Sequence, residues 1–251
     1  TPGNFIFRTI EFEQMEHQWF CKEGTDGDFY AEYKEKAWQF LLDLGFDPAH
    51  LRFKDHDKLA HYAKAACDIQ YDFPMGWSEL NGIHNRTDYD LSRHQEFSGK
   101  TLTYIDPVNG ERYIPYVIEY SIGADRLMLA ILSEAYDEET LENGEVRNVM
   151  RFHPAIAAYK AAVLPLQKNL APQAKELLAK LKKRFNVIYD EAGSIGKRYR
   201  RQDEIGTPYC ITVDFDTLEN GTVTVRERDS MEQIRLDEDG VIAFLTEKTA
   251  F

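Results

Sequence analysis

The chain has 251 residues, of which 43% are hydrophobic and 29% are charged, a globular composition that allows one large domain or two small ones. No uncharged apolar run approaches the ~18 residues of a transmembrane helix, and the first residues, TPGNFIFRTIEF, lack the pattern of a signal peptide. Cys21, Cys67 and Cys210 are widely spaced without a CxxC pair, which argues against a disulfide scaffold and a Cys-rich zinc site and favours a cytoplasmic protein.

The formal net charge of −13 is unevenly distributed along the chain. Residues 1–150 hold 14 basic and 28 acidic residues, whereas residues 151–251 hold 16 basic and 15 acidic residues. The acidic total argues against nucleic acid as a partner, but the shift predicts two domains with different roles, so a nucleic-acid contact in the second stays open. The polar segment 137–148, DEETLENGEVRN, is the expected linker.

The first part is predicted to alternate strands and helices. The alternation of Ile69, Tyr71 and Phe73 predicts a strand that ends at Pro74, and helical spacing predicts a helix that ends at Gly45. The expected elements are an extended segment over 5–20, helices over 28–44, 59–66 and 127–136, strands over 68–73 and 77–83, and a hairpin of 101–104 with 113–120. Together they predict a mixed, largely antiparallel sheet.

The second part has the expected order βαβαββα, which predicts a compact α/β domain. Asn220-Gly221 between two apolar runs predicts a tight β-hairpin turn. The expected strands cover 161–166, 186–189, 211–216 and 222–226, and the expected helices cover 171–185, 195–205 and 241–248.

The segment 7–16, FRTIEFEQME, is the first candidate site. In a strand, Phe12, Gln14 and Glu16 share one face, where an aromatic ring, an amide and a carboxylate could bind a base and an ammonium group. The alternative is a half-buried strand with a solvated acidic face.

The segment 119–126, EYSIGADR, joins a predicted strand to a predicted buried helix. Arg126 lies in the first helical turn, where a cation opposes the helix dipole, so its position indicates a role such as binding a phosphate or stacking on a base. The alternative is a surface arrangement of Arg126 with Asp125 beside a glycine turn.

Three further patterns are less specific. Glu79 lies in the aromatic and apolar stretch 77–80, WSEL, where a carboxylate pairs with a cation or binds a metal, and a core salt bridge is the alternative. His56, Asp57 and His61 resemble a metal cluster, for which Zn²⁺ is a possible ion. They straddle a predicted helix start, however, and the histidines at 17, 84 and 94 show no helical ligand spacing with them, which argues against a metal site. Ser194 and Cys210 have no nearby histidine for nucleophilic catalysis.

The segment 196–202, GKRYRRQ, is strongly basic. Lys197, Arg198, Arg200 and Arg201 surround Tyr199, a combination that can contact phosphates and bases. The alternative is a solvated basic helix face that the acidic residues at 203 and 204 balance.

Five long strings carry a family resemblance: FRTIEFEQME, GWSELNGI, NRTDYDLSRHQEFSG, ERYIPYVIEYSIGADR and GSIGKRYRRQDEIGTPYCITVDFDT. Together they resemble glycyl-tRNA synthetase of the homodimeric class II type, along essentially the whole chain. The resemblance implies an α+β fold. Residues 1–150 would form the C-terminal part of the class II catalytic domain, a partial antiparallel sheet with motif 3 and the second half of motif 2, and residues 151–251 an α/β anticodon-binding domain.

The resemblance also implies roles for the residues in these strings. The implied ATP-binding residues are Phe7, Arg8, Thr9, Ile10, Glu11, Phe12, Glu79, Leu80, Gly123, Ala124, Asp125 and Arg126. The implied glycine-binding residues are Phe12, Glu13, Gln14, Met15, Glu16, Glu119, Tyr120, Ser121, Ile122 and Gly123. Arg8 and Arg126 would be catalytic, Glu79 would help hold Mg²⁺, and Lys197, Arg198, Arg200 and Arg201 would contact tRNA.

The implied reaction has two steps, formation of glycyl-adenylate from glycine and ATP and transfer of glycine to tRNA(Gly). Two residues depart from the family pattern: Ile10 replaces the second arginine of FRTREF, and Tyr120 replaces the proline of EPS. Motif 1 and the first strand of motif 2 are not in this sequence, so we expect a C-terminal portion that does not aminoacylate alone. Two alternatives stay open, a non-catalytic, synthetase-like nucleic-acid-binding subunit and a ligase for another small amino acid.

Overall fold

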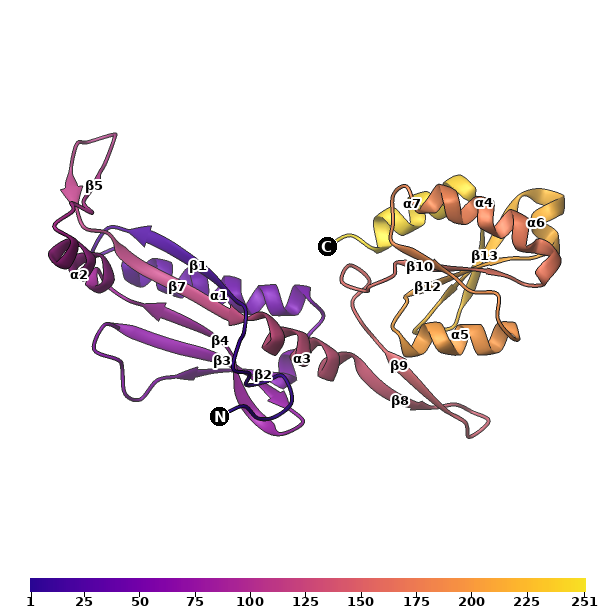
Figure 1. The fold of residues 1–251 in the computed structure, drawn as a ribbon, viewed down its shortest axis with the longest axis horizontal. Helices are drawn as coiled ribbons and strands as arrows, with labels where there is room; N and C mark the ends of the chain where they lie inside the picture. The colour runs from indigo at the N-terminus through magenta and orange to yellow at the C-terminus, as the bar shows by residue number, and fades with distance from the viewer. The chain divides into compact units, whose positions relative to one another are not determined.

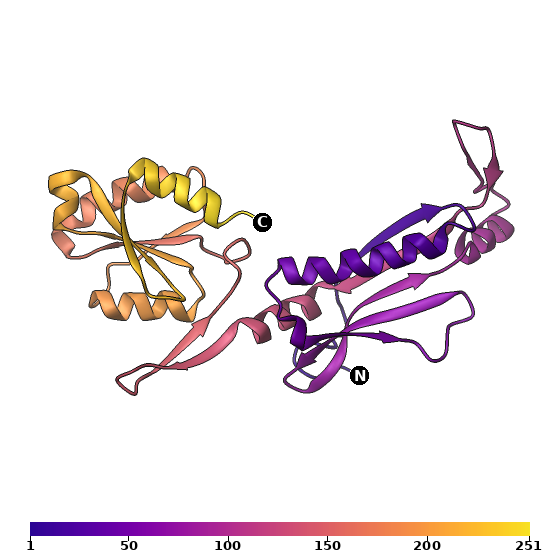
Figure 2. The ribbon, with the colours of Figure 1, turned by 180° about the vertical axis from the view of Figure 1, so that it is seen from behind.

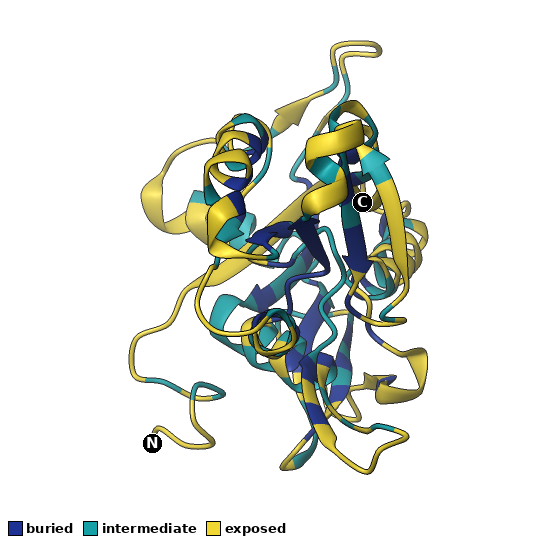
Figure 3. Cartoon of the chain, turned by 90° about the vertical axis from the view of Figure 1, so that its right-hand side faces the viewer, coloured by how far each residue is buried: buried dark blue, intermediate teal, exposed yellow.

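The computed structural model describes residues 1–251 and divides them into two compact units, Thr1–Ser133 and Glu134–Phe251 (Figure 1 and Figure 2). Buried residues gather in the sheets of the two units (Figure 3). None of the helices combines the length and the apolar character that spanning a bilayer requires.

The first unit is built on a five-stranded antiparallel sheet with the order β1-β7-β4-β3-β2. Its strands are β1 (Gln14–Cys21), β2 (Leu51–Asp55), β3 (Ala65–Phe73), β4 (Gly76–Asn85) and β7 (Tyr116–Gly123). The other elements are α1 (Asp26–Asp43), a 3-10 turn (Pro48–His50), α2 (Tyr89–Ser98), the short hairpin strands β5 (Tyr104–Ile105) and β6 (Arg112–Tyr113), and α3 (Ala124–Ala135).

Helix α1 packs along β7 and β4 and supplies one side of the core, as Figure 2 shows. Leu41 of α1 is buried with Ile69, Leu80 and Ile83 of the sheet and Ala130 of α3. The apolar residues of α1 recur at helical spacing, so their burial follows from the sequence pattern. The predicted helix over 28–44 and strands over 68–73 and 77–83 are therefore confirmed.

The short helix expected over 59–66 is wrong. Lys64 donates its backbone N–H to the carbonyl of Asn85 at 2.8 Å, and Ala65 and Ala66 already pair with β4. Pairing with a neighbouring strand satisfies these backbone groups, so the sheet overrides the weak helical spacing.

Asp26 at the start of α1 is 1% exposed and is the acceptor of a buried hydrogen-bond cluster. It accepts from Lys64 Nζ at 2.8 Å, Asn85 Nδ2 at 2.6 Å and the backbone N–H of Gly24 at 3.0 Å. Burial raises the pKa of this carboxyl, but the hydrogen bonds from Lys64, Asn85 and Gly24 outweigh it, so the pKa is lower than that of an ordinary aspartate.

We expect Asp26→Asn to remove an acid-sensitive part of the stability. Because the pKa of Asp26 is lower in the folded state, its contribution is complete above the unfolded pKa of about 3.9 and is lost as pH falls through the folded value. The difference in unfolding free energy between wild type and variant should therefore shrink below pH ~4. Urea unfolding across pH measures it, with exposed Asp28→Asn as control, and a difference independent of pH would contradict the role of the charge.

The second unit contains a five-stranded mixed sheet with the order β11-β10-β12-β13-β14. Its strands are β10 (Ala161–Pro165), β11 (Val187–Tyr189), β12 (Tyr209–Val213), β13 (Thr222–Glu227) and β14 (Gln233–Asp237). The helices are a 3-10 turn (Lys168–Leu170), α4 (Ala171–Leu181), α5 (Ile195–Glu204), α6 (Phe215–Asn220) and α7 (Glu238–Lys248). Strands β11, β10 and β12 are parallel, and β13 and β14 are antiparallel to their neighbours.

Helices cover both faces of this sheet (Figure 1). Leu181 of α4 and Leu245 of α7 are buried against alternate residues such as Val163, whereas Leu164 packs toward Tyr199 of α5. Successive side chains of a strand point to opposite faces, so the near-continuous apolar run of β10 fits a strand covered on both sides. The predicted α/β organisation of this part is confirmed.

The expected linker over 137–148 is instead a β-hairpin of β8 (Tyr136–Thr140) and β9 (Val146–Met150). Gly144 has a φ of 82°, so the Asn143-Gly144 pair forms its turn. Arg147 in β9 is 1% exposed and bonds to Asp203 of α5, which ties the hairpin to the second unit. The chain therefore divides between Ser133 and Glu134 and not at the change in charge near Arg151.

The expected hairpin turn at Asn220-Gly221 is also wrong, because α6 lies between β12 and β13. Asp214 caps α6 by accepting from the backbone N–H of Thr217 at 3.1 Å, and Gly221, with a φ of 71°, ends the helix. Asn-Gly here is a helix terminus, and the two strands still pair in antiparallel fashion.

Candidate functional site

A cavity of about 250 Å³ opens in the first unit where β1, β4 and β7 meet the start of α3. We call it the Arg126 cavity. Its lining residues are Ile6, Phe7, Arg8, Thr9, Phe12, Glu13, Gln14, Glu79, Leu80, Ser121, Ile122, Gly123, Asp125 and Arg126. The predicted nucleotide residues from three distant segments are thus brought together, except Ala124, Ile10 and Glu11, which are not among the lining residues.

Arg126 lies at the start of α3 and is held on two sides. Its guanidinium carbon lies 4.3 Å from the ring centroid of Phe7, and Nη1 donates to the backbone carbonyl of Glu79 at 3.0 Å. The carboxylate of Glu79 lies 3.4 Å from the same nitrogen. The alternative surface arrangement of Arg126 with Asp125 is therefore not what forms, and a planar cation is fixed on the cavity wall.

Glu79 and Phe12 lie at the rim of the Arg126 cavity. The side chain of Glu79 is 53% exposed, so the core salt bridge considered from the sequence is wrong, and the carboxylate faces solvent beside Arg126. Phe12 is 64% exposed just before β1, which leaves its ring surface open to a ligand.

A second cavity, of about 590 Å³, adjoins the first along β1 and β7, and we call it the Glu119 cavity. It is lined by Gln14, Glu16, Gln18, Phe20, His84, Arg86, Asp90, Leu91, His94, Val117, Glu119 and Ser121. Gln14 and Ser121 line both cavities. The shared face of Gln14 and Glu16 that strand alternation predicts is therefore confirmed.

Glu119 is 7% exposed and is the central acceptor of this cavity. Its carboxylate accepts from Arg86 Nη1 at 3.0 Å and from Gln18 Nε2 at 3.3 Å. Burial raises the pKa of Glu119, and the nearby Arg86 opposes that rise. Arg86 is also held by Asp90, at 2.7 Å from Nε, so the position of Glu119 is fixed by a chain of charged groups.

Two predicted glycine-binding residues line neither cavity. Tyr120 is directed toward the core, where its hydroxyl accepts from Asn81 Nδ2 at 3.1 Å, because neighbours in a strand alternate faces. Met15 is 47% exposed and alternates with Gln14 and Glu16 in the same way. Sequence reasoning missed Arg86, although it lies in the NRTDYD string, because its partner Glu119 is 33 residues away.

The four cations of the basic helix α5 do not form one exposed patch. Arg198 is 3% exposed and donates to the backbone carbonyl of Pro165 at 2.5 Å. Arg201 bonds to Asp190, at 2.9 Å from Nε, and Arg200 lies 3.7 Å from Asp203. Lys197 is exposed.

Tyr199, the aromatic residue of the basic segment, is also used by the fold. Its hydroxyl lies 2.7 Å from that of Thr212, and Arg226 lies 4.9 Å from its ring centroid. The expectation that this ring is available to stack on a base is therefore wrong.

Comparison with known proteins first defines a class. Residues 160–248 match the anticodon binding domain family. The RNA binding domain of threonyl-tRNA synthetase from Cryptosporidium parvum aligns with a TM-score of 0.70 at 16% identity, over 97% of this chain and 65% of that one, which shows a shared fold. Most of the second unit therefore matches an anticodon binding domain.

The chain is, along its whole length, a homologue of glycine–tRNA ligases. It is 59% identical over 253 aligned residues to the ligase of Clostridium kluyveri and 57% identical to those of Clostridium tetani and Caldanaerobacter subterraneus. In each alignment it is covered completely and spans 55% of the relative. The predicted resemblance is confirmed, and the chain spans about half the length of these relatives.

Proposed function

We propose that this chain is part of a glycine–tRNA ligase that activates glycine with ATP and attaches it to tRNA(Gly). The observation that carries the proposal is the pair of adjoining cavities on one antiparallel sheet. One holds a stacked arginine and aromatic rings, which suit a nucleotide, and the other holds buried and half-exposed carboxylates, which suit an ammonium group. Gln14 and Ser121 line both, so the two ligands would meet there.

The Arg126 cavity is the proposed ATP site. Phe12 would stack on adenine, Arg126 would lie on its other face or on the terminal phosphate, and Arg8 on the rim would reach the phosphates. The pairing of Arg126 with Phe7 and Glu79 supports this role, since it fixes the guanidinium before ATP arrives.

Glu79 is the proposed protein contact for Mg²⁺. Glu13 and Asp125 line the same cavity, so the donor set is made of carboxylate oxygens, which fits a hard cation held jointly by one or two carboxylates and by phosphate oxygens. A bound Mg²⁺ ion would neutralise part of the phosphate charge.

The Glu119 cavity is the proposed glycine site. Glu119 and Glu16 would accept hydrogen bonds from the glycine ammonium, and Arg86 would position Glu119. Glycine has no side chain, so a cavity that sterically excludes larger amino acids can select glycine without any side-chain contact.

In the proposed reaction, a glycine carboxylate oxygen attacks the α-phosphorus of ATP, and pyrophosphate leaves with the electron pair of the broken P–O bond. The terminal ribose hydroxyl of tRNA then attacks the glycyl carbonyl carbon, and AMP leaves. Arg8 and Arg126 are the proposed catalytic residues, because fixed cations stabilise the charge that develops on the phosphate oxygens.

The second unit is the proposed contact for tRNA. Lys197 is exposed, and the guanidinium of Arg200 lies 3.7 Å from Asp203, whereas Arg201 is bound more tightly, at 2.9 Å from Asp190. Lys197 and Arg200 are therefore the proposed phosphate contacts among the four predicted cations. Arg198 and Arg201 would support the helix that carries them. A homodimer acting in the cytoplasm is part of the same proposal.

Glycine-dependent ATP–pyrophosphate exchange tests this proposal in the full-length protein. We expect exchange with glycine and none with alanine or serine, whereas the 251-residue chain alone, spanning 55% of its relatives, is expected to give none. A synthetase-like nucleic-acid-binding subunit would instead bind tRNA without exchange and without a rise in melting temperature on addition of glycine and ATP. Absence of exchange, or absence of a rise in melting temperature with glycine and ATP, would contradict the ligase proposal for the full-length protein. Exchange by the 251-residue chain would contradict its expected inactivity.

A further inference from the structure

His56, Asp68 and His84 meet on one face of the first sheet. His56 Nε2 lies 2.9 Å from Asp68 Oδ1, and the two imidazole centroids are 6.0 Å apart with the rings at 81°. One possible ligand atom from each of the three side chains lies within 4.8 Å of the others. Two imidazoles and a carboxylate form a common ligand set for divalent transition metals.

The sheet register produces this meeting. Ala66 of β3 pairs with His84 of β4 and accepts the backbone N–H of His56, so an alanine separates the two histidines. The small methyl side chain of Ala66 leaves room for the imidazole rings of His56 and His84. Asp68, two residues along β3, lies on the same face as Ala66.

Gly82 gives the imidazole of His84 its space. A Cβ atom at Gly82 would lie 2.7 Å from His84 Cε1, and the φ of Gly82 is not in the positive range, so glycine is needed here for room and not for backbone freedom. The ring of His84 thus leans over Gly82, which pairs with Asp68 on the neighbouring strand.

The second nitrogen of His84 faces a carboxylate. His84 Nδ1 is buried without a hydrogen-bond partner, and Glu119 Oε1 lies 3.6 Å from it. Metal-bound histidines commonly donate their other ring N–H to a carboxylate, which fixes the ring and strengthens the ligand. The unpartnered Nδ1 and the nearby Glu119 therefore match the surroundings of a metal ligand that binds through Nε2.

We propose that His56, Asp68 and His84 bind one divalent transition-metal ion, of which Zn²⁺ is the best fit, with Glu119 as the hydrogen-bond partner of His84. Donors about 2.0–2.1 Å from a tetrahedral ion lie roughly 3.3 Å apart, so small side-chain rotations close the observed separations. All three side chains are partly exposed, which gives an ion and a water ligand access from solvent. The bound ion would hold His84 against Glu119 and so stiffen the wall of the Glu119 cavity.

Zinc titration of the untagged, metal-stripped 251-residue chain tests the site. Calorimetry is expected to show one Zn²⁺ per chain, and Co²⁺ is expected to give the visible absorption of a four- or five-coordinate site. His56→Ala and His84→Ala should each weaken binding at least about tenfold, as should Asp68→Asn. His61→Ala is the matched control, because His61 is exposed and contacts Tyr89 outside the cluster.

Glu119→Gln is a separate test, since it leaves all three ligands in place and should weaken Zn²⁺ binding by about 10-fold or more. Circular dichroism shows whether each variant is folded. If His56→Ala does not fold, His56→Gln replaces it, because position 56 lies just beyond the end of β2. Absence of Zn²⁺ binding by the wild type, or equal affinity in the wild type and the His56 variants, would overturn the proposal. Neither result depends on ATP, glycine or tRNA, so the site can fail independently of the ligase function.

Discussion

Asp203→Ala is expected to destabilise the second unit by about 3–5 kcal/mol. Asp203 is fully buried and accepts from Arg226 Nη1 at 2.9 Å and Nη2 at 3.1 Å. Arg147 Nη1, which is also buried, lies 3.3 Å from the same carboxylate. Removing the carboxylate leaves the buried guanidinium of Arg226 without its counter-ion and leaves Arg147 with Glu139 as its remaining carboxylate partner. An unpaired charge in the interior costs more than the bonds themselves contribute.

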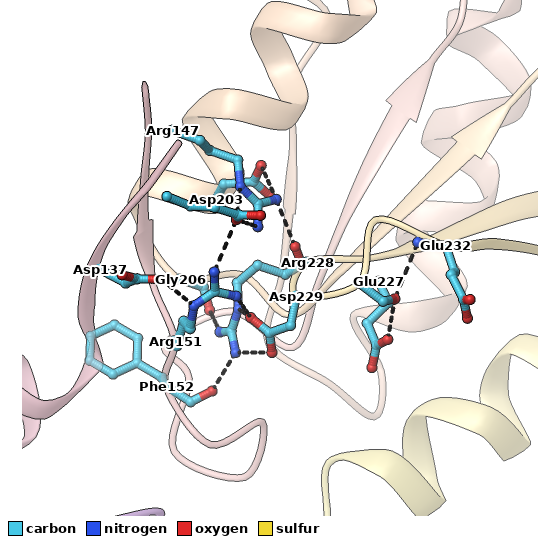
Figure 4. Close-up of polar contacts among 12 residues, drawn as sticks. Asp137, Arg147, Arg151, Phe152, Asp203, Gly206, Glu227, Arg228, Asp229 and Glu232 are labelled. Atoms are coloured by element: carbon cyan, nitrogen blue, oxygen red, sulfur yellow. Dashed lines mark hydrogen bonds and ion pairs between the residues drawn. The ribbon is translucent and has the colours of Figure 1, made fainter. Parts of the chain in front are cut away.

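The effect should extend to the β8–β9 hairpin. Figure 4 shows Arg147 beside Asp203, and Arg151 near Asp229 and Asp137. Because Arg147 joins β9 to α5, the loss of Asp203 removes one of the contacts that attach the hairpin to the rest of this unit. We therefore expect faster amide hydrogen exchange in residues 136–150 as well as lower global stability.

Urea unfolding followed by circular dichroism measures the change in stability. Glu204→Ala is the matched control, because Glu204 is the next residue of α5 and is exposed, so its loss should change the unfolding free energy by less than about 0.5 kcal/mol. A loss below about 1 kcal/mol for Asp203→Ala would show that water or rearranged side chains compensate both arginines and would contradict the role given to this carboxylate.

Local patterns predicted the elements that depend on nearby residues. The periodicity around Leu41 identified α1, and the alternation of Ile69, Tyr71 and Phe73 identified β3, because burial of one face follows directly from the spacing. Asn220-Gly221 misled, since the same pair suits a tight turn and the left-handed end of a helix, and only the cap formed by Asp214 distinguishes them.

The charge pattern was harder to interpret, because the sequence does not show which charged residues pair with one another. The shift near Arg151 suggested a boundary there, but residues 134–150, which include the hairpin, add six acidic residues and one basic residue to the second unit. The net charge of this unit is therefore −4 and not near neutral. Buried Arg147 is one of the residues that attach this hairpin, and nothing in a sequence distinguishes a buried arginine from a surface cation.

The candidate site shows the same limit. Alternation along β1 predicted that Gln14 and Glu16 share a face, but no spacing rule links Arg86 to Glu119 or His84 to His56. Those pairs depend on the order β1-β7-β4-β3-β2, which brings together residues that are distant in the chain. The proposed roles of individual residues came from the family resemblance, and the structure adds the neighbours that position those side chains.

Arg126→Ala in the full-length protein is expected to lower glycine-dependent ATP–pyrophosphate exchange by about 10²–10³-fold, the usual cost of losing one fixed group that stabilises transition-state charge. Arg126 is held by the ring of Phe7 and the carbonyl of Glu79, so its guanidinium needs no further ordering when ATP binds. Arg126→Lys is expected to remain strongly impaired, because an ammonium group lacks the planar face that stacks on Phe7.

The split between kcat and the KM for ATP distinguishes a catalytic role from a binding role. A fall in kcat with little change in KM indicates an interaction made mainly in the transition state, whereas a rise in KM alone indicates ground-state binding. Arg93→Ala serves as control, because Arg93 is an exposed arginine of α2 that pairs with Glu96 outside both cavities. An unchanged melting temperature excludes a merely structural effect at Arg126. Exchange within about fivefold of wild type would contradict the catalytic role, because even a tenfold loss corresponds to only about 1.4 kcal/mol of the activation barrier.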